Sequence, residues 1–202
     1  MEEPISHIDY RFTSRTFECE EKYLFEIQGD IYNHEEFDED TLIGKIKYYI
    51  LNVEESDIHA DDLLDIYSNT AAFIGNFYNK SGHTLKRKIK KLIGYEILNI
   101  NILILDRIEI LPKFRGKKLT SEIIEDGIRH FGKNISLLAL KSFPLQFEYQ
   151  NTYSEISLWQ KDMQLDSLNK DEKNAFLHLN QYYKSLGFTK LNDDNIMVKI
   201  IE

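Results

Sequence analysis

The pattern of apolar and polar residues predicts three strands and then a long helix in the N-terminal part of the chain. Residues 10–19 and 22–28 are typical of two strands joined by a charged turn, and 33–40 is acidic and polar, which predicts a loop. Residues 41–53 are rich in Ile and Tyr and alternate in part, which indicates a third strand. Residues 58–78 place apolar side chains at helical spacing, so we expect one long helix there.

Strands and helices alternate in the C-terminal part, which indicates a mixed α/β (α+β) class. Residues 91–111 are apolar and β-branched, and the break at Asn99-Ile100-Asn101 favours two strands over one helix. The later pattern predicts a helix over 118–131, a buried strand over 135–140, a helix over 154–168, a helix over 171–186 with Asp171 as its N-cap, and a hairpin of 188–191 and 196–201.

Composition and charge place the chain among ordinary globular proteins. Its 202 residues, 42% hydrophobic and 29% charged, suit one domain with a substantial core. The net charge of −9 argues against a nucleic-acid partner, because phosphate binding needs clustered Lys and Arg. No apolar run is long enough to span a membrane, and the N-terminus has no basic and apolar leader. We therefore expect a cytoplasmic protein without membrane contact.

The spacing of metal-binding residue types gives no support for a metal site. Cys19 is the only cysteine, so no internal disulfide can form. The six histidines are scattered, and none has a partner at the local spacing of a zinc ligand. We expect no metal.

Basic residues gather where a predicted strand ends and a helix begins, within IEILPKFRGKKLT (108–120). The first N–H groups of a helix lack internal partners, and the helix dipole adds positive charge there. Arg115, Lys117 and Lys118 oppose that dipole, at a cost of roughly 0.3–1 kcal/mol each, unless an anion is bound. Gly116 lets a ligand approach the backbone closely. These residues predict an anion site that suits a pyrophosphate, and a basic helix start without a ligand is the alternative.

Two motifs together resemble the GNAT acyltransferases. LDRIEILPKFRGKKL is similar to the family's strand L-E/x-R-I-x-V-x-P and its loop R/Q-x-x-G-x-G/A, which opens a helix. QYYKSLGFTKL, followed by IMVKII, resembles the family's A-x-x-x-Y-x-x-x-G-F and closing strands. The chain departs from the pattern at Lys118, where the family has glycine, and Thr120 stands at the small-residue position. A lysine at 118 is expected to offer its N–H in a helical conformation.

The resemblance implies a GNAT-like fold with a largely antiparallel central sheet and flanking helices, and acetyl-CoA as co-substrate. It implies one domain over 1–202, with a variable part at 1–90 that holds strands and the long helix, a cofactor-binding core at 91–202, and an insertion near 142–169. The implied cofactor contacts are Ile110, Leu111, Lys113, Arg115, Gly116, Lys117, Lys118, Leu119 and Thr120. A backbone N–H at Ile110 or Leu111 would polarise the thioester carbonyl.

The resemblance also implies catalytic roles for three side chains. Tyr183 matches the family's tyrosine and would donate a proton to the thiolate, although a core aromatic is the alternative. Tyr182 is the second choice. Asp106 is the first candidate for the base and Glu109 the second, with an ion pair as the alternative role. Asp106 shares the strand alternation of Ile108 and Ile110, so we expect it on their face.

The expected function is transfer of an acetyl group from acetyl-CoA to a primary amine of a small molecule or a protein. The acidic chain suits polyamines, aminoglycosides or lysine side chains, and the sequence does not rank them. A module that binds acyl-CoA without turnover is the alternative, and assembly as a homodimer stays open.

Overall fold

A seven-stranded sheet forms the centre of the molecule. The computed structural model describes residues 5–15, 19–34, 40–93, 99–151 and 157–201. The strand order is β1-β2-β3-β4-β5-β7-β6, and neighbouring strands are antiparallel except the parallel pair β4 and β5. The bounds are β1 His7–Phe12, β2 Leu24–Asn33, β3 Thr41–Leu51, β4 Ile102–Ile110, β5 Leu137–Lys141, β6 Thr189–Lys190 and β7 Ile196–Ile200. The mixed α/β class with a mostly antiparallel sheet is therefore confirmed.

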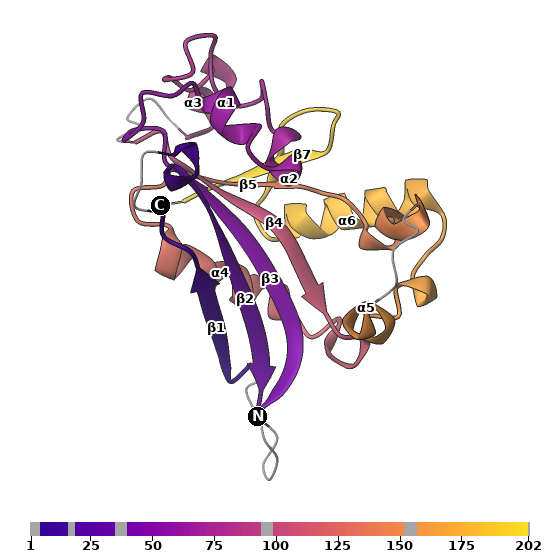
Figure 1. Ribbon diagram of the computed structural model, residues 1–202. Coiled ribbons are helices and arrows are strands. Elements are labelled where there is room, and N and C mark those ends of the chain that lie inside the picture. The colour runs from indigo at the N-terminus through magenta and orange to yellow at the C-terminus, as the bar shows by residue number, and fades with distance from the viewer. Residues whose placement is uncertain (1–4, 16–18, 35–39, 94–98, 152–156, 202) are drawn as a thin grey trace.

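Helices cover both faces of this sheet (Figure 1). Successive side chains of a strand point to opposite faces. Thus Leu105 of β4 packs in a cluster with Ile123 of α4, whereas Ile104 packs in a second cluster with Leu63 of α1. The helices are α1 Ala60–Leu64, α2 Ser68–Ala71, α3 Arg87–Ile93, α4 Leu119–Phe131, α5 Leu158–Asp162 and α6 Glu172–Ser185, with single turns or short 3₁₀ segments at η1 Glu20–Lys22, η2 Pro112–Phe114, η3 Leu145–Asn151 and η4 Leu165–Ser167. Within the described part of the chain, no helix has both the length and the apolar character needed to cross a membrane.

The predicted long helix over 58–78 is wrong. The short helices α1 and α2 stand there, followed by turns. Tyr67 between the two helices is extended (φ −118°, ψ 137°), and Gly75 has a φ of 68°, outside the helical range. The Thr70 hydroxyl donates to the carbonyls of Leu64 and Tyr67, at 2.6 and 2.9 Å. Because side chains satisfy the backbone of these turns, the apolar residues are buried together without a continuous helix.

Other element boundaries also differ from the prediction. β1 begins and ends earlier than expected, and β2 continues into the predicted loop. Residues 91–93 belong to α3, and 94–98, the next part of that predicted strand, lie outside the described residues. The predicted helix over 154–168 reduces to α5 and η4, and its first residues, 154–156, lie outside the description. The predictions of α4, β5, α6 with its Asp171 cap, and the closing hairpin are confirmed.

Candidate functional site

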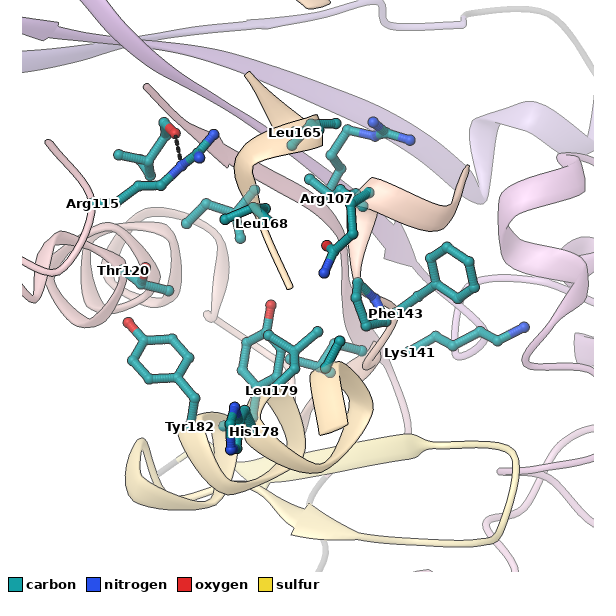
Figure 2. A pocket seen from close by; sticks show the side chains of 18 of the residues that line it. Arg107, Arg115, Thr120, Lys141, Phe143, Leu165, Leu168, His178, Leu179 and Tyr182 are labelled. Atoms are coloured by element: carbon teal, nitrogen blue, oxygen red, sulfur yellow. Dashed lines mark hydrogen bonds between the residues drawn. The ribbon is translucent and has the colours of Figure 1, made fainter. Parts of the chain in front are cut away.

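The parallel strands β4 and β5 separate partway along their length. Their pairing ends with Leu105 opposite Leu140, after which β4 continues to Ile110 against β3 alone. β5 ends one residue later, at Lys141. A cavity of about 430 Å³, here called the main cavity, opens where the strands part, and residues of α4 and α6 also line it (Figure 2).

Residues 157–168, here called the strap, form one wall of the main cavity. The strap holds α5 and η4, and it begins with a capping box between Ser157 and Gln160. Its side chains Met163, Leu165 and Leu168 line the cavity, and Met163 is buried. Figure 2 shows Leu165 and Leu168 on the strap. The wall that they form is apolar, so this side of the cavity suits an uncharged part of a ligand.

The basic loop before α4 has an open backbone shape. Gly116 has a φ of 77°, and Lys118, the N-cap of α4, has φ 64° and ψ 14°. Lys118 is thus left-handed and not helical as expected, and its side chain makes no capping hydrogen bond. A second hollow of about 250 Å³, here called the loop cavity, lies against this loop and is also lined by Tyr182. The first residues of α4 therefore border a cavity, as an anion site at a helix start requires.

The left-handed Lys118 leads to a stability prediction. An L-residue with a side chain pays roughly 1–2 kcal/mol for this conformation, and glycine does not. Lys118→Gly is therefore expected to raise the free energy of unfolding by about 1 kcal/mol, measured by urea titration. Lys117→Gly is the matched control, because the φ of Lys117 is not positive, and it should not stabilise. Equal effects of the two substitutions would contradict the prediction.

Arg115 bonds to two carbonyl groups of the protein. Its Nε donates to the Ile110 carbonyl at 2.9 Å, as the dashed line in Figure 2 marks, and its Nη2 donates to the Met163 carbonyl. Partial burial lowers the pKa of Arg115. The guanidinium therefore ties the strap to the end of β4, and it lines both the main cavity and the loop cavity.

The remaining predicted cofactor residues divide into two groups. Thr120 lines both cavities, and Gly116, Lys118 and Leu119 line the loop cavity. Leu111, Lys113 and Lys117 line neither. The ammonium groups of Lys113 and Lys117 lie 5.4 and 4.9 Å from the ring centroid of Phe114. The amide N–H of Leu111 donates to the Ile43 carbonyl at 2.9 Å, so Ile110 is the better candidate for a backbone donor.

Tyr183 lies on α6 in the wall of the main cavity. Its side chain is buried, with its ring centroid 5.6 Å from that of Phe188 in an edge-to-face arrangement. No described residue hydrogen bonds with the Tyr183 hydroxyl. Burial, with a smaller contribution from Tyr182, raises the pKa of Tyr183. The hydroxyl thus stays protonated at neutral pH and can act as a donor.

A β-bulge sets the direction of Asp106. Lys47 of β3 lies opposite Arg107, but the next residue, Tyr48, lies opposite Leu105, so Asp106 is the extra residue. Because the bulge interrupts the alternation, Asp106 does not share the face of Ile108, and that prediction is wrong. Its carboxylate points toward α2 on the other face, where it meets Asn69.

The Asp106 carboxylate is mostly buried and only lightly paired. It accepts a hydrogen bond from Asn69 Nδ2 at 2.9 Å, and Lys47 Nζ lies 3.8 Å away. Burial raises the pKa of Asp106, and the contact with Asn69 opposes the rise in part. Asp106 lines the main cavity and also a cavity of about 220 Å³ on the α2 face, here called the second cavity. Asp106 therefore borders both cavities.

Glu109 is held by hydrogen bonds from other side chains, at a place outside the main cavity and the second cavity. It is 7% exposed, and it accepts hydrogen bonds from Arg107 at 2.8 Å and from Trp159 Nε1 at 2.6 Å. Arg107 also contacts Glu148. Glu109 lines neither the main cavity nor the second cavity. Glu109 and Arg107 therefore form a structural ion pair, and the hydrogen bond from Trp159 to Glu109 fixes the strap to β4.

Sequence reasoning missed several groups in the cavity walls. Asn69 comes from α2, Lys141 from the end of β5 and His178 from α6. These residues are far apart in sequence and have no shared spacing, so no local pattern could have joined them. Within the described ranges, no three His, Cys, Asp or Glu side chains cluster as metal ligands would.

Comparisons with known proteins give no further guide to the site. No protein-family model matches the chain, and searches of curated proteins and of solved structures find no match.

Proposed function

We propose that the chain is an N-acyltransferase of the GNAT type that transfers an acetyl group from acetyl-CoA to a primary amine. The observation that carries the proposal is the gap between β4 and β5. It opens into the main cavity on the α4 side and into the second cavity on the α2 side, with Asp106 lining both. Two substrates that enter from opposite faces of the sheet would meet at this gap.

The donor's charged end suits the loop cavity. The first N–H groups of α4, the helix dipole and the ammonium of Lys118 all favour a pyrophosphate there. The apolar main cavity, which shares Ile110, Arg115, Thr120 and Tyr182 with the loop cavity, continues from it and suits the uncharged arm of the donor.

The reaction then needs two proton transfers. The amine nitrogen attacks the thioester carbonyl carbon and gives its proton to the Asp106 carboxylate, directly or through water. The carbon–sulfur bond breaks, and the thiolate takes a proton from the Tyr183 hydroxyl, which solvent then restores. The raised pKa of Asp106 makes it a stronger base than an ordinary carboxylate. A backbone N–H at Ile110 would stabilise the developing oxyanion.

A module that binds acyl-CoA without turnover is the second candidate. Lys118, with its side chain at a backbone position that suits glycine, favours this candidate.

Calorimetric titration with acetyl-CoA and with free CoA tests the proposal. We expect micromolar binding by the wild type and at least tenfold weaker binding by Arg115→Ala/Lys118→Ala, because contacts to charged groups contribute about 1.5–3 kcal/mol. Lys88→Ala/Lys91→Ala removes the same charge from the exposed side of α3 and should bind like the wild type. No binding at millimolar ligand would refute both candidates, and binding without thiol release in the presence of amines would favour the module.

A further inference from the structure

The second cavity combines opposite charges with an apolar wall. It is lined by Asp106 and Glu148, by Arg107 and Lys141, and by apolar side chains that include Phe73 and Phe143. It shares six lining residues with the main cavity: Leu105, Asp106, Arg107, Lys141, Phe143 and Leu145. Figure 2 shows Lys141 and Phe143 on the side of the main cavity away from Thr120 and Tyr182. This end is therefore the side on which an acceptor, and not the charged end of the donor, would lie.

The two cations of the second cavity differ in their partners. Arg107 contacts both Glu109 and Glu148, which neutralise it. Lys141 is exposed, and no described carboxylate forms an ion pair with it. Asp106 has the ammonium of Lys47 only at 3.8 Å. The cavity thus presents one unpaired ammonium and one lightly paired carboxylate.

Strand geometry puts these two residues at neighbouring positions on one face of the sheet. Leu105 pairs with Leu140, so Asp106 and Lys141 are the next residues along two neighbouring strands. Alternation along β5 turns Lys141 to the face that Ala139 shares with the α1–α3 helices, and the bulge turns Asp106 to that same face. A ligand with an amine and a carboxylate a few bonds apart would match both groups.

We infer that the acceptor is a free α-amino acid with an apolar side chain, and this inference rests on the proposed function. Asp106 takes the amine, Lys141 holds the carboxylate, and the wall formed by Phe73, Ala72 and Leu145 takes the side chain. The cavity of about 220 Å³ suits a molecule the size of a single amino acid. A polyamine or aminoglycoside is a poor match, because the two cations in the wall balance the two carboxylates and leave no net attraction for a polycation.

Acceptor pairs that differ only in the carboxylate test the inference. Thiol release from acetyl-CoA is measured with L-leucine, L-methionine and L-phenylalanine, with the amines that remain when each loses its carboxylate, and with spermidine. We expect kcat/KM for at least one of the amino acids to exceed that for its matching amine by about tenfold or more. In Lys141→Met, the fall in kcat/KM for that amino acid should exceed the fall in kcat/KM for its matching amine by about tenfold or more. Lys141→Arg should retain most of the preference. Lys133→Met, which removes an exposed lysine outside both cavities, is the matched control and should retain all of it.

The outcomes separate this inference from the proposed function. Equal rates with an amino acid and its amine, a preference for spermidine, or equal losses on both members of a pair in Lys141→Met would overturn the inference and leave an amine acyltransferase. Absence of transfer to every compound, in a protein that binds acetyl-CoA, would overturn the proposed function and the inference with it.

Discussion

Replacing Tyr183 with Phe is expected to lower the rate of acyl transfer by about 10²- to 10⁴-fold, the usual contribution of a positioned acid. Tyr183 lines the main cavity, and burial raises the pKa of its hydroxyl, so the hydroxyl is protonated at neutral pH. The phenylalanine ring would keep the edge-to-face contact with Phe188 but would have no proton to give. Thiol release under saturating acetyl-CoA measures the effect on kcat.

The stability of Tyr183→Phe separates a catalytic role from a packing role. Since no described residue hydrogen bonds with the hydroxyl, the free energy of unfolding should change by less than about 0.5 kcal/mol. Tyr182→Phe is the comparison, because Tyr182 also lines the main cavity and is 38% exposed. A large loss of kcat in Tyr182→Phe, with none in Tyr183→Phe, would show that Tyr182 and not Tyr183 is the proton donor. A parallel loss of stability would assign Tyr183 to the core.

Asp106→Asn is expected to lower kcat/KM by about 10²-fold or more at pH 7, because an amide cannot accept the amine's proton. The dependence of kcat/KM on pH tests whether Asp106 is the base. Burial raises the pKa of Asp106, so the rising limb of the wild-type profile should lie above the range of an exposed carboxylate. That limb should be absent from the residual activity of the variant.

Asp106→Asn, which lowers activity, is expected to raise the stability of the fold. A carboxylate whose pKa is higher in the folded than in the unfolded state costs stability as the pH rises through its folded value. Asp106→Asn removes this cost, and the amide oxygen can still accept from Asn69. We therefore expect a higher free energy of unfolding at pH 7, with the gain shrinking as the pH falls below the raised pKa. Urea titrations at several pH values measure it.

Glu109→Gln is the matched control for Asp106→Asn, because it neutralises the other carboxylate of the same strand. Glu109 is buried with Arg107 and Trp159, so its neutralisation should lower stability at pH 7 instead of raising it. A loss of stability in Asp106→Asn like that in Glu109→Gln would show that the Asp106 carboxylate belongs to a structural ion pair.

Local sequence patterns were sufficient for the elements around the basic loop and at the C-terminus. The apolar repeat of α4 and α6, the Asp171 cap and the glycines at 116 and 187 act over a few residues, because helix period, capping and positive φ are local properties. The sequence therefore placed Tyr183 on a helix and the basic loop before one, where the structure has them.

Contacts between distant segments decided the rest. The apolar spacing of 58–78 satisfies a helix and a folded chain of turns equally well, and bonds such as those of Thr70 selected the turns. The direction of Asp106 depends on a bulge, which is a property of the register between β3 and β4 and not of either strand alone. The place of Asp106 and Lys141 in one cavity wall likewise requires β4 and β5 to pair as far as Leu105 and then separate. Periodicity and capping by themselves determined the elements around the basic loop and at the C-terminus, whereas only the tertiary structure determined the turns of 58–78 and which side chains share a cavity, because strand register and direction are set by packing between elements.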